Sequence, residues 1–143
     1  KVYGEICGKI AEGLKEIGIE AEHEPINDVV TENGKISGAT LKREDGITYI
    51  GGTLLYDVDV EEMFSLLTPS EDKKKDKRIK EHKERISTIK KESDASFDEA
   101  VRALNEALLE GLEFEVSDLE FSEVKRAEEL ANKYSEDEWL YRS

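Results

Sequence analysis

Two turn dipeptides, Asn33-Gly34 and Asp45-Gly46, constrain the fold of this chain more than any other feature. Both lie between segments rich in apolar and β-branched residues, and Asn-Gly and Asp-Gly pairs favour tight β-hairpins. We therefore expect an antiparallel meander with a type I′ turn at Asn33-Gly34. Its strands are expected at residues 26–31, 35–42 and 47–57.

Helical periodicity surrounds this meander, because apolar residues recur at the three- and four-residue spacing of a helix with one buried face. Ser96 and Glu99 carry the signature of a capping box, and Gly111 marks the end of the helix that they open. The helices are expected at residues 3–17, 60–67, 96–111 and 121–134, the last capped by Ser122, and an edge strand is expected at 114–119. This order of elements predicts an α+β domain, an antiparallel sheet flanked by helices.

The charge of the chain limits its partners. A length of 143 residues suits one domain, and a formal net charge of −14 argues against general nucleic-acid binding. Residues 71–91 are an exception, because ten Lys or Arg stand against five Asp or Glu there. This segment is either a solvated helical face or loop, or a docking surface for an acidic partner such as a carrier domain. Ile86 and Ile89 within it are expected to anchor the chain on the core.

Cysteine and histidine usage restricts the chemistry. Cys7 is the only cysteine, so no intrachain disulfide is possible, which fits a reducing cytoplasm. Its place on an early helix without a neighbouring histidine favours packing over nucleophilic catalysis. His23 and His82 lack the spaced partners of a zinc site. No segment has the apolar length that spans a bilayer and no signal-peptide pattern is present, so we expect a cytoplasmic location.

Lys35 is the residue whose position raises a functional question. It follows a turn glycine, where a strand lysine ordinarily extends into solvent. The alternative is an anion site, because the nearby Gly34, Gly38 and Gly52 would let backbone N–H groups approach a ligand closely. Spacing alone leaves both interpretations open.

Four stretches occur in a fixed order around Lys35: PINDVV, NGKISG, GGTLLYDVD and EEMFSLL. In this order they resemble the catalytic domain of lipoate–protein ligases, within the biotin/lipoate ligase superfamily. That family's pattern runs Pro-x-Asn-Asp, Gly-Lys-Ile-Ser-Gly, His-Gly-Thr-Leu-Leu and Asp-x-Asp before a helix. ERISTIK and DEWLYRS are similar to later parts of the same pattern, so the resemblance covers nearly the whole chain.

The resemblance implies an enzyme with a two-step reaction. Lipoate attacks the α-phosphate of ATP to give lipoyl-adenylate, and a lysine of a lipoyl carrier domain then attacks this mixed anhydride. The expected cofactors are ATP and Mg²⁺, with lipoate as substrate. The expected carrier is the E2 component of a 2-oxoacid dehydrogenase or the H protein of glycine cleavage.

The resemblance also assigns roles to residues of this chain. Lys35 matches the essential lysine, whose ammonium stabilises the charge growing on the α-phosphate and acyl oxygens. Asn27 and Asp28 match a pair near the nucleotide, where Asp28 would help to hold Mg²⁺. The positions that line the adenylate pocket correspond to Ser37, Gly38, Gly52, Thr53 and Leu54, and Gly51 and Gly52 are expected beside the lipoyl group.

Three departures from the family pattern leave alternatives open. The upstream Arg-Arg and glycine-rich segment is absent, Gly51 replaces a histidine and Leu41 replaces a glutamine. We therefore expect residues 1–143 to be the carboxyl-terminal portion of a catalytic domain, completed by a second polypeptide or a cleaved amino-terminal portion. A non-catalytic module that binds lipoyl domains or nucleotide is one alternative, and a meander domain without a ligand is another.

Octanoyl or lipoyl transfer is the remaining alternative. The related octanoyltransferases form a cysteine acyl-enzyme, and one branch places this cysteine near the position of Pro25. No cysteine occurs there in this chain, which favours ATP-dependent ligation.

Overall fold

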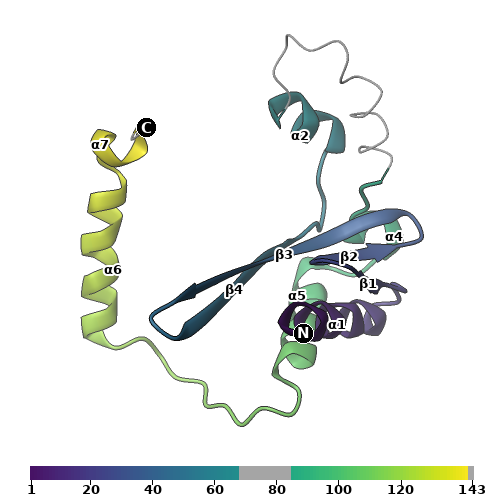
Figure 1. Ribbon diagram of the computed structural model, residues 1–143, viewed down its shortest axis with the longest axis horizontal. Helices are drawn as coiled ribbons and strands as arrows, with labels where there is room; N and C mark the ends of the chain where they lie inside the picture. Colours follow the sequence, from purple (N-terminus) through teal and green to yellow (C-terminus); the bar gives the residue numbers. More distant parts are fainter. Residues whose placement is uncertain (68–84, 142–143) are drawn as a thin grey trace. The chain divides into compact units, whose positions relative to one another are not determined.

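The computed structural model describes residues 1–67 and 85–141 (Figure 1). They form two compact units, Lys1–Gly111 and Leu112–Ser143, and each is described by itself. Most of the charged segment 71–91 lies outside the described residues, so its predicted role as a docking surface stays a prediction.

The first unit is built on a four-stranded antiparallel sheet in the order β1-β2-β3-β4 (Figure 1). The strands are β1 Glu22–Glu24, β2 Asp28–Thr31, β3 Gly34–Glu44 and β4 Ile47–Leu54. Every neighbouring pair is antiparallel, as the meander predicts. The third predicted strand ends at Leu54 rather than at residue 57, and the predicted α+β class is confirmed.

The two hairpin turns differ, and the predicted type I′ turn at Asn33-Gly34 is wrong. Asp45 and Gly46 have φ values of 51° and 79°, so both central residues of the second turn take the positive φ that type I′ requires. Asn33 has no positive φ, whereas Gly34, with φ 128°, already begins β3. A Cβ at Gly34 would lie 2.3 Å from the carbonyl oxygen of Arg85. Gly34 therefore serves the close approach of another segment rather than a tight turn.

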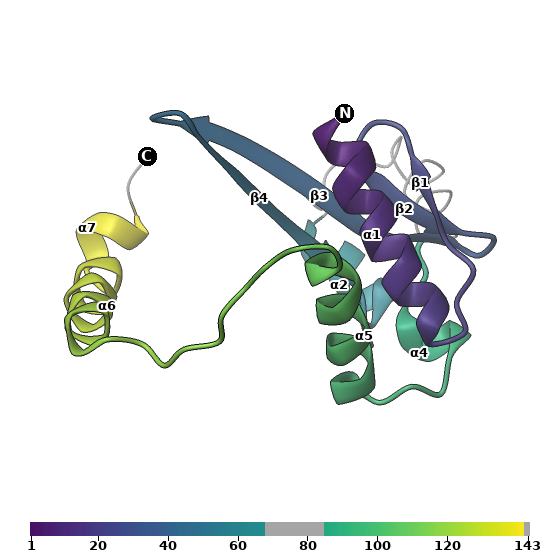
Figure 2. The ribbon, with the colours of Figure 1, turned by 90° about the horizontal axis from the view of Figure 1, so that it is seen from below.

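Two helices form the layer that packs on the sheet (Figure 2). α1, Val2–Glu16, contacts β1 and β2, and α5, Phe97–Leu109, packs against α1. Gly13 permits this approach, because a Cβ there would lie 3.1 Å from the carbonyl oxygen of Ala103. The Lys9 ammonium donates to the carbonyl oxygens of Ala107 at 3.1 Å and Glu110 at 2.8 Å, and so ties α1 to the end of α5. The core contains Cys7, Leu14, Ile19, Val29, Ile36, Ala39, Ile89 and Ala100.

Two shorter helices and a cap complete the first unit. α2 is Val60–Leu67, as predicted, and α4 is Ile89–Glu92. Ile89 is fully buried and confirms the predicted anchor on the core. The predicted capping box of α5 is present: the Ser96 hydroxyl accepts from the Glu99 N–H, and the Glu99 carboxylate accepts from the Ser96 N–H at 2.8 Å.

The second unit consists of α6, Phe121–Tyr134, and α7, Asp137–Leu140. The α6 helix is where the sequence predicts it, but its N-cap is Glu120, whose N–H donates to Glu123 at 2.7 Å, and not Ser122. The edge strand predicted at 114–119 is wrong: those residues are exposed and pair with no described strand. Among the described helices, none combines the length and the apolar character that crossing a membrane requires.

Candidate functional site

A β-bulge sets the direction of Lys35. Val29 pairs with Ser37, but Val30 pairs with Lys35, so Ile36 has no partner on β2. Ile36 and Ser37 are consequently both buried, although neighbours on a regular strand face opposite sides. Without the extra residue, Lys35 would share the core face of Ser37. The bulge instead places Lys35 on the face opposite the core.

Lys35 meets Asp28 on that face. The ammonium nitrogen lies 2.6 Å from Asp28 Oδ1, with the side chains 42% and 27% exposed. That carboxylate oxygen is itself buried and has the ammonium as its counter-ion. The predicted pairing of Lys35 and Asp28 in one site therefore has a direct geometric basis.

Gly38 lies beneath this ion pair. It is the cross-strand partner of Asp28, and a Cβ there would lie 3.0 Å from both Cε and Nζ of Lys35. Its φ is outside the positive range. The space above Gly38, and not an unusual backbone conformation, is what accommodates the lysine.

Asn27 holds the entry to β2 against β3. Its side-chain amide donates to the carbonyl oxygen of Ala39, and its own carbonyl oxygen accepts from the Ala39 N–H at 2.8 Å. In this structure the Asn27 amide therefore orients the chain beside Asp28.

The segment before α4 forms one wall of the site. Lys35 N–H donates to the carbonyl oxygen of Arg85 at 2.6 Å, and Ser87 N–H donates to the carbonyl oxygen of Lys35 at 2.9 Å, so residues 85–87 run parallel to the start of β3. The side chains of Ser87 and Thr88 are buried behind this wall. Sequence reasoning did not assign Arg85 to the site, and the ERISTIK stretch was the signal that could have done so.

An open depression of about 640 Å³ contains the ion pair. Its lining residues are Glu24, Asp28, Val30, Thr31, Glu32, Asn33, Gly34, Lys35, Phe64, Arg85 and Ile86. Cations from Lys35 and Arg85 thus share the depression with carboxylates from Glu24, Asp28 and Glu32. Glu24 and Phe64 are further residues that the sequence pattern did not identify.

The remaining predicted residues divide between the two faces of the sheet. Thr53 is opposite Gly38 and Gly51 is opposite Thr40, so Thr53 and Gly51 lie on the same face of the sheet as Lys35. Ser37 pairs with Leu54, and Ala39 with Gly52, on the core face. Ser37 is only 3% exposed, and a Cβ at Gly52 would lie 2.8 Å from the Gly38 carbonyl oxygen. The predicted set is therefore brought together in part, and Gly51 and Gly52 do not share a face.

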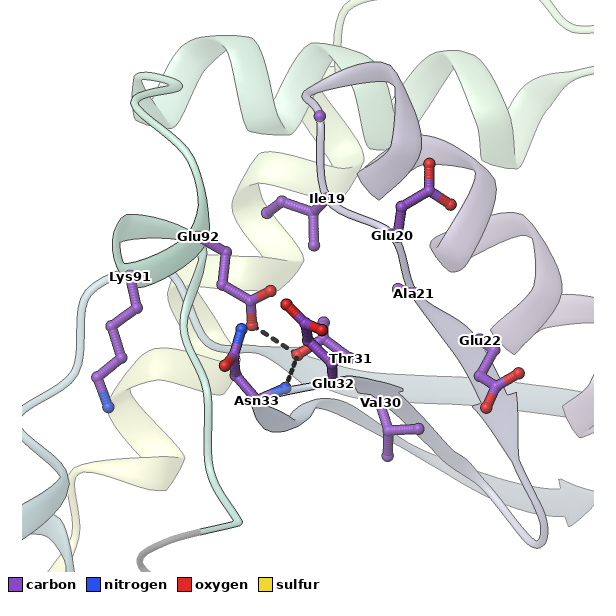
Figure 3. A pocket seen from close by; sticks show the side chains of 11 residues that line it. Ile19, Glu20, Ala21, Glu22, Val30, Thr31, Glu32, Asn33, Lys91 and Glu92 are labelled. Carbon is purple, nitrogen blue, oxygen red and sulfur yellow. Dashed lines mark hydrogen bonds between the residues drawn. The ribbon is translucent and has the colours of Figure 1, made fainter.

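A second depression, of about 690 Å³, shares residues 30–33 with the first (Figure 3). Glu20, Glu22, Glu32 and Glu92 surround it, with Lys91 as its cation. The Glu92 carboxylate accepts hydrogen bonds from the hydroxyls of Thr31, at 2.6 Å, and Ser87. These bonds fasten the turn to α4. Four carboxylates against one cation disfavour a phosphate ligand more than the three carboxylates and two cations of the Lys35 depression do. The Lys35 depression is the better candidate site.

The predicted magnesium role of Asp28 stays a prediction. The described ranges contain no group of three or more His, Cys, Asp or Glu side chains that could hold a metal. The one buried oxygen of Asp28 already faces an ammonium at 2.6 Å, which repels a second cation.

Cys7 is a core residue and not part of this site. It is fully buried on α1. Burial raises the pKa of its thiol, and the Asp28 carboxylate raises it further. Both effects oppose formation of the thiolate that a nucleophile needs, so the packing interpretation is confirmed.

With this geometry established, similarity to known proteins identifies the family. The sequence model of the lipoyl protein ligase A/B catalytic domain matches residues 1–109. The chain belongs to this family. Its curated relatives include both octanoyltransferases and lipoate–protein ligases, and the predicted resemblance is confirmed at the level of the family.

Individual relatives show how much of a longer protein this chain represents. Octanoyltransferase LipM of Staphylococcus aureus is 30% identical over 119 residues, which are 80% of this chain and 43% of that relative. A bi-partite lipoate protein ligase from Thermoplasma acidophilum matches with a TM-score of 0.84 and 26% identity, over 96% of this chain and 56% of that one. A lipoate-protein ligase A bound with ATP matches in fold with a TM-score of 0.76 and 22% identity, over 96% and 57%. The chain thus spans about half the length of these proteins.

Proposed function

We propose that this chain is the Lys35-bearing part of an ATP-dependent lipoate–protein ligase. The observation that carries the proposal is the Lys35 ammonium, which the bulge directs to the open face of the sheet beside Asp28. A positioned cation on an open face suits a reaction in which negative charge grows on phosphate and acyl oxygens.

The proposed first step joins lipoate to AMP. A carboxylate oxygen of lipoate attacks the α-phosphorus of ATP, the bond to the β-phosphate oxygen breaks, and pyrophosphate leaves. Lys35 stabilises the charge on the α-phosphate oxygens without forming a bond itself. Arg85, at the rim of the same depression, is placed to attract the departing pyrophosphate. The ATP-bound state of a neighbour with the same fold supports this choice of nucleotide.

The proposed second step transfers the acyl group to a carrier. The amine of a carrier lysine attacks the acyl carbon, AMP leaves, and the amine loses a proton as the amide forms. The T. acidophilum neighbour is described as bi-partite and was characterised with its E2 lipoyl domain. This precedent supports a lipoyl domain as acceptor and a further polypeptide portion as the complement of this chain.

Octanoyl transfer is the second candidate, because the curated relatives include octanoyltransferases. A cysteine acyl-enzyme would need a thiolate within reach of an acyl donor. The chain's single cysteine is buried on α1, and its pKa is raised. This geometry favours the ligase over a cysteine-dependent transferase.

Lys35→Ala tests the proposal in the chain completed by its complementary portion. We expect formation of lipoyl-adenylate from ATP and lipoate to fall by at least about a hundredfold, the usual cost of losing one group that stabilises developing charge. Lys42→Ala is the matched control, because Lys42 lies on the same strand and pairs with exposed Glu44. Equal adenylation by the Lys35→Ala protein would reject the site. Tight binding of an adenylate analogue without turnover would favour the non-catalytic binding module.

A further inference from the structure

The Lys35 ammonium has a defined resting place in this structure. Asp28 Oδ1, 2.6 Å away, is buried and has no hydrogen-bond partner among the described residues, so the ammonium is its ionic partner. The carboxylate is therefore committed to Lys35 and to no competing group among the described residues. An oxygen in this position draws the ammonium toward the sheet rather than toward solvent.

Gly38 provides the surface on which the lysine lies. A methyl group there would lie 3.0 Å from Cε and Nζ of Lys35 and 3.4 Å from Asp28 Oδ1. Contacts near 3.0 Å are closer than carbon atoms normally approach, so the ion pair would have to move. Because the backbone of Gly38 does not need the positive-φ conformation, alanine there would test the space alone.

The bulge and residues 85–87 also fix the backbone of Lys35 itself. The backbone of Lys35 is held on both sides, by Arg85 at its N–H and by Ser87 at its carbonyl oxygen. The Cα of Lys35 therefore has a fixed position, and the ammonium can move only by rotation of the side chain. Among the described residues, Asp28 and Gly38 restrict it.

We infer that Asp28 and Gly38 are the positioning residues of Lys35: Asp28 as its counter-ion and Gly38 as the gap that lets the ammonium reach this counter-ion. The inference deepens the proposed function, since it rests on Lys35 as the catalytic cation. It gives Asp28 a role toward the lysine that is separate from the magnesium role that the family resemblance implies. An anionic substrate group arriving on this face then meets an ammonium whose position is already set.

Acylation of lysines in the intact 143-residue chain tests the positioning directly. The chain is treated briefly with acetic anhydride, and the modification rate of each lysine is read by peptide mass spectrometry. We expect Lys35 to react several-fold more slowly than Lys42, whose partner Glu44 is exposed. Asp28→Asn and Gly38→Ala should each raise the Lys35 rate several-fold, and Asp28→Glu should restore most of the protection because it keeps the carboxylate.

Two internal controls separate positioning from a loss of fold. Lys9, held by carbonyl oxygens at the end of α5, reports on the packing of the first unit, so its rate should be unchanged in every variant that folds. Glu44→Gln should raise the rate of Lys42 and leave that of Lys35 unchanged. An unchanged Lys35 rate in both Asp28→Asn and Gly38→Ala, with Lys9 still protected, would overturn the inference.

An activity measurement keeps the inference distinct from the proposed function. In the completed enzyme, misplacement of Lys35 should lower kcat for adenylation in Asp28→Asn and Gly38→Ala, with a smaller change in KM for ATP. If Lys35→Ala adenylates normally while the acylation pattern follows the expectation, the proposed function fails and the positioning stands. If Lys35→Ala is inactive but Asp28→Asn keeps full kcat, the positioning role fails.

Discussion

At the scale of single residues, one unpaired residue on β3 determines which face of the sheet Lys35 lies on. Ile36 has no partner across the bulge, and this shifts the alternation so that Lys35 and Gly38 face the same side. The cost of the bulge is a local interruption of the ladder, and the core gains two consecutive buried side chains, Ile36 and Ser37. The same residue that anchors the strand thus aims the candidate catalytic lysine.

Cys7 is expected to be chemically inert in the folded chain. Its thiol is fully buried, and burial together with the Asp28 charge raises its pKa. At pH 8, reaction with a disulfide reagent should be at least about a hundredfold slower than in denaturant, since exposing a core residue costs several kcal/mol. Because the folded pKa is raised, folding favours the protonated thiol. The stability linked to this preference is fully present below the unfolded pKa of the cysteine and is lost as pH rises through the folded pKa. Fast labelling of the native chain would contradict this placement.

Gly34→Ala should destabilise the chain strongly. The new Cβ would lie 2.3 Å from the carbonyl oxygen of Arg85, and φ at this position is 128°. Together these effects should lower the free energy of unfolding by about 2–4 kcal/mol, measured by urea denaturation. Gly8→Ala is the matched control: it lies inside α1, and apart from the adjacent residues and the backbone of its own helix no described atom lies within 4 Å of the new Cβ. That change should stabilise by about 0.5–1 kcal/mol, and equal effects of the two changes would contradict the packing of residues 85–87 on β3.

The sequence predicted the residues of the site better than their geometry. The family resemblance placed Lys35 and Asp28 in one site, and the antiparallel pairing of β2 with β3 brings them together. The bulge at Ile36 was not foreseen, since apolar–polar alternation reads the same with or without one unpaired residue. Ser37 and Leu54 therefore lie on the core face rather than beside Lys35.

At the scale of elements, the N-cap predicted for α5 agrees with the structure and the N-cap predicted for α6 does not. Ser96 and Glu99 form the predicted capping box at α5. At α6 the helix begins two residues earlier than a Ser122 cap would allow, so Glu120 takes the cap position and Glu123 accepts a hydrogen bond from its N–H. Several polar residues near that helix start could act as caps, and only the backbone conformation decides among them.

Ser96→Ala should destabilise α5 by about 1 kcal/mol, the usual cost of losing an N-cap. The pKa of Glu99 is lowered, chiefly by the hydrogen bond from the Ser96 hydroxyl and then by that from its N–H. The stabilisation from this lowered pKa is present above the unfolded pKa of Glu99 and is lost as pH falls through the folded value. The variant should therefore lose less stability than the wild type on acidification, measured by thermal unfolding between pH 7 and pH 3.

Ser122→Ala is the control for that experiment, because this serine lies inside α6 and caps nothing. We expect it to change stability by less than about 0.5 kcal/mol. A loss as large as that of Ser96→Ala would mean that Ser122 is the cap after all.

At the scale of the whole molecule, the fold class followed from the sequence but the division into two units did not. The turn dipeptides and the helical periodicity suffice for an antiparallel sheet with helices. The segment 112–120 was expected to contain an edge strand because FEVSDL alternates apolar and polar residues. A strand requires a neighbour, and the described residues offer none to this segment. The alternating pattern therefore predicted a strand that has no pairing strand among the described residues.

The boundary between the units gives a test of their independence. The family match ends at residue 109, and the first compact unit ends at Gly111. Residues 112–120 are exposed and have no helix or strand, so among the described residues a glutamate-specific protease should cut first after Glu113, Glu115 or Glu120, followed with time by mass spectrometry. The sheet, α1 and α5 make their core contacts within the first unit. The cut product should therefore keep the acylation protection of Lys9 and unfold at the temperature of the intact chain. A product that loses this protection would show that the family domain depends on α6 and α7, and the boundary near residue 111 would then not separate independent units.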